Sequence, residues 1–222
     1  MGLTSEQIQQ IVTYLNFKEL THLDLRNELL DHMAIGIEKS IEEKDLGFEK
    51  AFNQEVKKWN LELENYSSFW LGWAWSGPKL MIKKCVAQTK KTYLINLIST
   101  LLLMALSYSM ITFFQFGKYL DLMTKALGIL YLGFFFSIVF AHLKIKFSKF
   151  TTSYSYLFKI HAVGSAFFYL WFNPLWSKFS GFETAGTEMW VTLFFHMLLT
   201  SFAYTYWDLF KLHFNANKLN LK

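Results

Sequence analysis

Four ionisable side chains, Lys159, His161, His196 and Asp208, lie within long apolar stretches of the sequence. An imidazole in such surroundings can ligate haem or a metal, or bind a quinone. Counted from the same end of the predicted helices, the two histidines differ in depth by roughly 9 Å at about 1.5 Å per residue, a poor arrangement for ligating one group together. We therefore interpret each histidine as a hydrogen-bonding partner of a neighbouring helix. Lys159 either extends to the near interface or pairs with Asp208, and we predict the pair.

A second polar cluster is predicted on one helix near the N-terminus. Asp24, Glu28 and His32 follow at i, i+4 and i+8, with Asp31 alongside. Carboxylates and an imidazole at this spacing can bind a divalent metal, but no fourth ligand is visible and the HExxH pattern is absent. We therefore interpret Glu28, Asp31 and His32 as a polar edge that binds a protein partner.

No motif of an enzyme occurs in the sequence. It contains no P-loop, no glycine-rich dinucleotide turn, no GxSxG and no CxxC. We predict a protein without catalytic residues, metal or cofactor, which does not contact nucleic acid directly.

The composition is that of a membrane protein joined to a soluble piece. Of the 222 residues, 53% are hydrophobic and 18% charged, against about 45–50% and about 25% in soluble domains. The single Cys85 excludes a disulfide-rich fold. Residues 1–64 hold 7 Lys and Arg against 13 Asp and Glu, a net charge of −6, whereas residues 65–222 hold 15 against 4, a net charge of +11.

Residues 1–64 are predicted to form a head of three short amphipathic helices. A capping box of Thr4 and Gln7 begins the first helix, whose apolar stripe is Ile8, Ile11, Val12 and Leu15. The second helix begins near Asp24 and ends at Gly47, and the third extends from residue 48 to about 60. The stripes of the second and third helices are Leu30, Met33, Ile37 and Ile41, and Phe48, Phe52, Val56 and Trp59.

Residues 65–91 combine aromatic and basic side chains and are predicted to lie at a membrane surface. Tryptophan favours the headgroup level, and lysines are attracted to anionic lipid. A loop whose tryptophans pack on the head is the alternative. We expect the lysines to bind lipid rather than the acidic head, so that the head projects away from the membrane. The predicted interfacial residues are Trp70, Trp73, Trp75, Lys79, Lys83, Lys84, Lys90 and Lys91.

Residues 92–222 are predicted to form four transmembrane helices, because a helix needs roughly 20 apolar residues to cross the hydrocarbon. The spans are about 93–116, 120–141, 154–172 and 189–210. Eleven lysines of the ranges 79–91, 144–149 and 211–222 lie on one side of such a bundle. By the positive-inside rule, both termini face the cytoplasm. The expected fold is all-α, a small cytoplasmic three-helix domain followed by a four-helix transmembrane bundle.

Part of the head resembles a known helical module. The segments RNELLDH (26–32), IE (37–38) and GFEKAF (47–52), with GPK at 77–79, are similar to small helical domains that precede membrane spans in uncharacterised Bacteroidetes proteins. More loosely, residues 4–60 resemble the HAAS-type domain, which is often encoded beside PadR-family transcription regulators. The resemblance implies membrane-associated regulation and supplies no catalytic residues.

Together these patterns predict a non-enzymatic regulatory or sensory protein of the bacterial inner membrane, whose acidic head binds a protein partner. The alternative is an accessory subunit of a larger membrane complex, such as a transporter or a respiratory assembly. Membrane lipids are expected partners in both cases, and the chain can form a homo-oligomer. An enzyme that uses His161 or His196 is a distant third reading.

Overall fold

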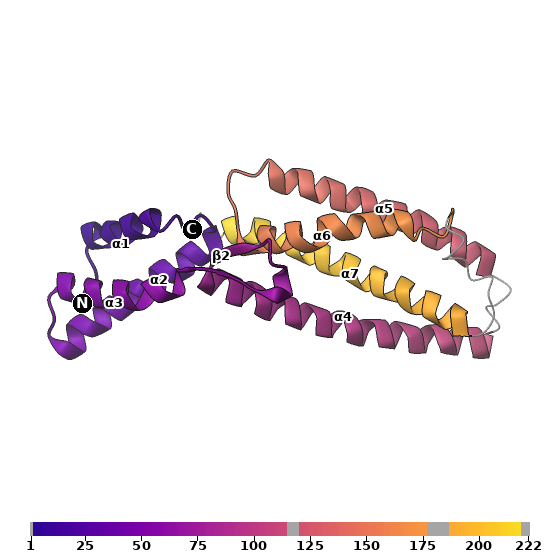
Figure 1. Ribbon diagram of the computed structural model, residues 1–222, viewed down its shortest axis with the longest axis horizontal. Coiled ribbons are helices and arrows are strands. Elements are labelled where there is room, and N and C mark those ends of the chain that lie inside the picture. Colours follow the sequence, from indigo (N-terminus) through magenta and orange to yellow (C-terminus); the bar gives the residue numbers. More distant parts are fainter. Residues whose placement is uncertain (1, 115–119, 177–186, 219–222) are drawn as a thin grey trace. The chain divides into compact units, whose positions relative to one another are not determined.

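The computed structural model describes residues 2–114, 120–176 and 187–218, and this part of the chain is mostly helical, which confirms the all-α prediction. It divides into two compact units, and the helices of both are labelled in Figure 1. Unit 1 contains residues 1–89, 149–156 and 213–222, and unit 2 contains residues 90–148 and 157–212. Unit 1 thus adds residues 65–89 and two later segments to the head predicted from residues 1–64.

The head consists of α1 (Ser5–Phe17), α2 (Leu23–Lys44) and α3 (Phe48–Glu62). The predicted capping box is present at the start of α1: the Gln7 N–H donates to Thr4 Oγ1 at 3.3 Å, and the Thr4 N–H donates to Gln7 Oε1 at 2.8 Å. These two bonds satisfy amide groups that the first turn of a helix leaves without partners.

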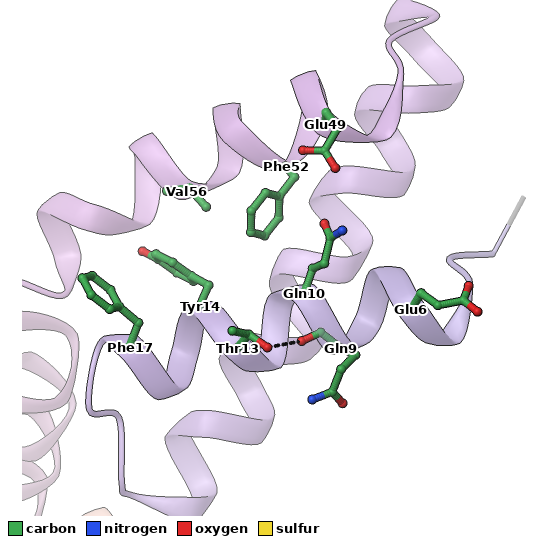
Figure 2. A pocket seen from close by; sticks show the side chains of 9 residues that line it. All are labelled: Glu6, Gln9, Gln10, Thr13, Tyr14, Phe17, Glu49, Phe52 and Val56. Atoms are coloured by element: carbon green, nitrogen blue, oxygen red, sulfur yellow. Dashed lines mark hydrogen bonds between the residues drawn. The ribbon is translucent and has the colours of Figure 1, made fainter.

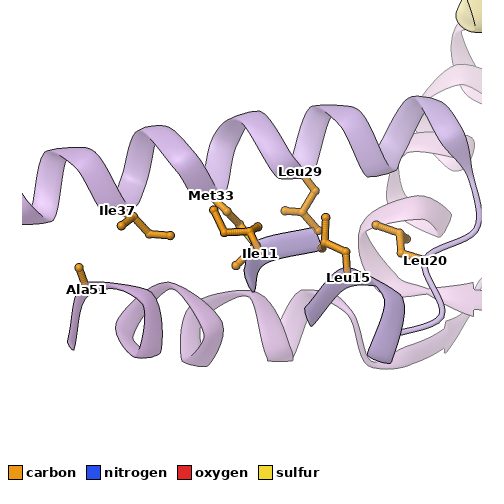
Figure 3. Close-up of a cluster of buried hydrophobic side chains, with 7 residues drawn as sticks. All are labelled: Ile11, Leu15, Leu20, Leu29, Met33, Ile37 and Ala51. Atoms are coloured by element: carbon orange, nitrogen blue, oxygen red, sulfur yellow. The ribbon is translucent and has the colours of Figure 1, made fainter. Parts of the chain in front are cut away.

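The core of the head lies along one face of α2, which packs against both other helices (Figure 3). Ile11 and Leu15 from α1 meet Leu29, Met33 and Ile37 from α2 there. The predicted stripe of α3 is only partly buried. The buried residues of this helix are instead Ala51 and Glu55.

The end of α2 differs from the prediction. The helix stops at Lys44, and Asp45 takes the left-handed conformation with φ of 52°. Gly47 instead precedes the first turn of α3, in extended backbone. Aspartate tolerates the left-handed region better than most residues, so it ends the helix two positions before the glycine.

Residues 65–78 form a small hairpin that the sequence did not indicate. Strands β1 (Asn65–Ser67) and β2 (Ser76–Pro78) pair in an antiparallel manner, with Tyr66 opposite Gly77, and a short 3-10 helix, η1 (Phe69–Leu71), lies between them. The hairpin leads into α4 (Lys79–Phe114), in which the predicted basic helix and the predicted first span are one continuous helix.

Unit 2 contains most of α4 and all of α5 (Leu120–Lys146), with α6 (Ser153–Trp171) from residue 157 and α7 (Thr187–Lys218) up to residue 212. In the described residues, α4 and α5 are long and apolar enough to cross a membrane. Contacts within the unit join Tyr93 to Phe202 and Tyr108 to Trp190, so α4 and α7 run antiparallel. The Tyr131–Tyr169 contact and the bond from Asn173 to the Gly128 carbonyl show the same for α5 and α6.

The side chains of unit 2 have an inverted distribution of polarity. Large apolar side chains are exposed along all four helices, among them Leu102, Ile129, Phe136, Phe140, Phe167 and Val191. Polar side chains are buried between the helices, among them Asn96, Thr100, Asn173, His196 and Ser201. A water-soluble domain rarely exposes so much contiguous apolar surface, whereas lipid tails cover such a surface without cost.

Candidate functional site

Three lysines at the start of α4 form ion pairs with the acidic head. Lys84 Nζ lies 2.5 Å from the carboxylate of Glu28, and Lys83 and Lys79 lie 2.9 and 3.7 Å from that of Glu62. These three lysines thus contact the acidic head, and their predicted contact with lipid stays a prediction. The hairpin brings the start of α4 back to α3, so the pairs of Lys79 and Lys83 with Glu62 form at little further entropic cost.

Asp24 joins the head to the start of α6. The backbone N–H of Ser153 donates to Asp24 Oδ1 at 2.8 Å, and the Ser153 hydroxyl donates to the other carboxylate oxygen. A carboxylate at a helix N-terminus satisfies a free amide and is favoured by the helix dipole. Beside it, the Leu23 N–H donates to the Thr151 carbonyl at 2.8 Å, and Thr151 Oγ1 donates to the Thr21 carbonyl at 3.0 Å.

His213, near the end of α7, is fully buried in the same region. Its Nδ1 lies 2.9 Å from Thr152 Oγ1, and its ring stacks on Phe150 with centroids 4.5 Å apart. Thr152 also caps the start of α6. Its Oγ1 accepts from the Ser155 N–H at 3.1 Å, and its own N–H donates to Ser155 Oγ at 3.0 Å.

We call Asp24, Ser153, Thr152 and His213 the junction. It ties the first turn of α2 to the first turn of α6 and to the last turns of α7, all within unit 1. The sequence analysis placed Asp24 at the start of the second helix and among possible metal ligands, and it missed His213. Hydrogen bonds between residues 129 and 61 positions apart leave no local pattern. The junction therefore connects three elements mechanically.

The predicted polar edge is exposed, but its members have separate surroundings. Glu28 pairs with Lys84, His32 stacks on Trp59 with centroids 6.5 Å apart, and Asp31 is exposed. Asp24 caps α6 instead of meeting Glu28 and His32 at a metal. Within the described residues, no three His, Cys, Asp or Glu side chains gather closely enough to hold a metal ion.

The aromatic segment divides into two parts. Trp70 and Trp73 are exposed, Trp73 to 80%, whereas Trp75 packs edge-to-face on Tyr156 at 5.5 Å between ring centroids. Leu71 between them is buried. Trp75 thus packs on protein, but on α6 and not on the head as the alternative reading had it. The contact of Trp70 and Trp73 with a membrane surface stays a prediction.

The intramembrane polar residues of the prediction do not form one site. His196 Nδ1 lies 2.7 Å from the hydroxyl of Tyr131, and His161 meets Tyr93 edge-to-face at 5.9 Å. Among the ion pairs of the described residues none joins Lys159 to Asp208, so the predicted pair is absent there. Lys159 is exposed, and its position on the outside of α6 directs it away from the interior of the unit.

One polar cluster in unit 2 was not foreseen. Asn96 Oδ1 accepts from Ser201 Oγ at 2.8 Å and from Thr205 Oγ1 at 3.1 Å, which connects α4 to α7. Tyr169 on α6 donates to the Leu199 carbonyl at 2.6 Å. These uncharged side chains are easily overlooked in an apolar sequence, yet interhelical hydrogen bonds of this kind stabilise helix contacts in lipid.

A groove of about 830 Å³ lies between α1 and α3 on the surface of the head (Figure 2). It exists because α1 and α3 both pack on α2 and contact each other much less. Tyr14 and Phe17 from α1 face Phe52 and Val56 from α3 across it (Figure 2). The Tyr14 hydroxyl donates to Asn60 Oδ1 at 3.1 Å and joins the two helices, and burial raises the pKa of Tyr14, so this hydroxyl stays protonated.

Comparisons with known proteins give no relative. The chain matches no protein-family model, no curated protein and no solved structure.

Proposed function

We propose that this chain is a non-enzymatic regulatory protein of the bacterial inner membrane, in which a cytoplasmic helical head binds a protein partner and communicates with four membrane-spanning helices. The single observation that carries this proposal is the junction. It ties α2 of the head, through Asp24 and Ser153, to the first turn of α6, and Thr152 in turn contacts His213 of α7. A partner that shifts α2 therefore acts on the ends of two further helices.

Four spans are supported by the inverted polarity of unit 2. The exposed apolar side chains occur on α6 and α7 as well as on α4 and α5, for example at Phe167 and Val191. The antiparallel contacts of α4 with α7 and of α5 with α6 agree with a chain that crosses four times. The ionisable residues in α6 and α7, such as Lys159 and Asp208, lower the average hydropathy of these two helices but still permit a span.

The segments that make up unit 1 support the cytoplasmic location of both termini. The head, the segment 149–156 and the end of α7 belong to this one unit, and the lysine-rich ranges of the sequence fall within or beside the same segments. Lysine excess marks the cytoplasmic side. Lys118, Lys178 and Glu183 fall between the predicted spans on the opposite side, and they lie outside the described residues.

Orientation is tested with a membrane-impermeant maleimide on intact cells. In a Cys85→Ser background, Trp176→Cys, in the exposed segment after α6, should be labelled in intact cells. Phe17→Cys, exposed on α1, should be labelled only after permeabilisation. The reverse pattern would place the head outside the cytoplasm and overturn the proposed location.

The regulatory role is tested by purification of the tagged chain from native membranes in mild detergent. A regulator should be recovered as a monomer or homo-oligomer with a substoichiometric partner. Removal of residues 2–62 should abolish recovery of that partner while the helices of unit 2 remain in the membrane. Recovery in a large complex of fixed stoichiometry, unaffected by removal of the head, would instead identify an accessory subunit.

A further inference from the structure

We propose that the groove between α1 and α3 binds one basic amphipathic helix of a partner protein. This inference rests on the proposed partner-binding role of the head and names the surface and the kind of partner. The surface differs from the predicted polar edge of Glu28, Asp31 and His32.

The shape of the groove matches a helix. Three helices with α2 in the middle leave a furrow between α1 and α3, which is the place that a fourth helix occupies in a bundle (Figure 2). The 13 residues of α1 span roughly 20 Å, the length of about four helical turns. A helix that presents apolar side chains at i, i+3 or i+4, and i+7 would place them along the groove.

The floor of the groove supplies the apolar contact. Tyr14 packs edge-to-face on Phe52 at 6.3 Å, and Phe52 stacks on Phe48 at 5.7 Å. Phe17 at the end of α1 remains 80% exposed, although Ile11 and Leu15 on the same helix are fully buried. An exposed phenylalanine beside two partly buried aromatic rings is typical of a surface that a partner covers.

The charge at one end of the groove selects a basic occupant. Glu6 and Glu49 both line the groove, and both lie in the first turn of their helices. The two helix N-termini contribute about +0.5 charge each, so the two carboxylates still leave this end negative. None of the nine lining residues is basic. At the other end Lys18 lies 5.9 Å from the rings of Tyr14 and Phe17, which confines the negative charge to the Glu6 end.

The net charge of the head argues against the same groove of a second copy as occupant. Each head carries −6 from 7 basic and 13 acidic residues, so two heads repel one another. An anionic lipid surface is disfavoured for the same reason, since Glu6 and Glu49 would face it. A partner helix with Lys or Arg beside its apolar stripe meets both the charge and the apolar floor.

The binding test uses the full chain in phosphatidylcholine nanodiscs and a fluorescent peptide of about 14 leucines and lysines in an amphipathic helical pattern. Anisotropy, corrected for empty nanodiscs, should report saturable binding. A peptide with the same composition in scrambled order, and one with glutamate for lysine, should each bind at least tenfold more weakly. Equal binding of either control would overturn the proposal.

Matched variants locate the peptide on the groove. The pair Glu6→Gln with Glu49→Gln, and separately Phe17→Ser, should each weaken binding about fivefold or more, since these side chains are exposed and their loss leaves the core intact. The control pair Asp31→Asn with Glu43→Gln removes the same charge elsewhere on the head and should change binding less than twofold. A loss of similar size in the control pair would show general attraction to the acidic head and overturn the groove.

A crosslinking experiment separates failure of the groove from failure of the proposed function. p-Benzoylphenylalanine at position 17 or 31 is activated in cells that naturally contain the chain, and the crosslinked peptide is sequenced. Attachment at position 17 of a segment with a basic amphipathic pattern supports the groove. Attachment only at position 31 overturns the groove and leaves a partner-binding head. Attachment of a second copy at position 17 overturns the named partner, and attachment at neither position overturns both proposals.

Discussion

The carboxylate of Asp24 accepts a hydrogen bond from the backbone N–H of Ser153 at 2.8 Å, although 129 positions separate the two residues in the chain. A side chain of α2 thereby caps the first turn of α6 within unit 1. The first turn of α6 is therefore stabilised by a residue of α2. Asp24 has a structural role, whereas its sequence pattern was that of a solvated or metal-binding acid.

Asp24→Ala should lower the free energy of unfolding by about 0.5–2 kcal/mol, the usual cost of losing an N-cap side chain. Asp24→Asn retains an acceptor for the Ser153 N–H and should cost less. Hydrogen–deuterium exchange should become faster in residues 21–26 and 152–157 of the alanine variant. Asp31→Asn, which alters an exposed acid on the same helix, is the control, and a similar increase in that variant would rule out a specific cap.

The Glu28–Lys84 pair should contribute about 0.2–1 kcal/mol, because both side chains are partly exposed, at 48% and 34%. A double-mutant cycle with Glu28→Gln and Lys84→Met measures this coupling energy in chemical unfolding of unit 1. The coupling should decrease in 1 M salt, where charges are screened beyond about 3 Å. A coupling of zero at low salt would contradict a stabilising role of the pair.

Glu62 should make the stability of unit 1 depend on acid pH. The hydrogen bond from Lys83, with the nearby charge of Lys79, holds the pKa of Glu62 below its ordinary value of 4.5. The folded state therefore binds this proton less readily than the unfolded state. Its stabilising contribution is complete above the unfolded pKa and is lost as the pH falls through the folded value. Glu62→Gln should flatten this part of the stability curve below about pH 5, and an unchanged curve would contradict the pairing.

Gly128→Ala should destabilise unit 2 by about 1–3 kcal/mol, because a methyl group there would overlap the Leu175 side chain at 2.4 Å and Asn173 Oδ1 at 2.9 Å. It would also disturb the bond from Asn173 Nδ2 to the Gly128 carbonyl. Gly133→Ala is the matched control on α5, since nothing lies within 4 Å of its added methyl. Thermal unfolding in detergent compares the two, and equal effects would contradict the close approach of α5 to residues 173–175.

Tyr131→Phe should cost about 0.6–2 kcal/mol in the same unfolding assay, the range measured for interhelical hydrogen bonds in membrane proteins. The hydroxyl lies 2.7 Å from His196 Nδ1 and donates to the His196 carbonyl at 3.2 Å, both in the buried interior of unit 2. Tyr108→Phe, whose hydroxyl lies on an exposed side chain, is the comparison. A larger loss at position 108 would contradict the assignment of Tyr131 to the interior.

The sequence by itself determined the helices, since helix periodicity and caps are local. The capping box of Thr4 and Gln7 and the burial of Ile11, Met33 and Ile37 follow from spacing over a few residues. The difference in charge and hydrophobicity between residues 1–64 and 65–222 also follows directly from the residue types. The hairpin of residues 65–78 was not, because three-residue strands carry too few alternating positions to give a pattern.

Only the tertiary structure decided which charged side chains meet. Helix spacing placed Asp24, Glu28 and His32 on one face, but their partners are Ser153, Lys84 and Trp59, which come from other elements. The pair of Lys159 and Asp208 was inferred from similar depth alone, yet pairing also requires that both side chains face each other around their helices. The physical reason is that a hydrogen bond or ion pair acts over about 3 Å, whereas sequence pattern fixes height along a helix and leaves the neighbour across it undetermined.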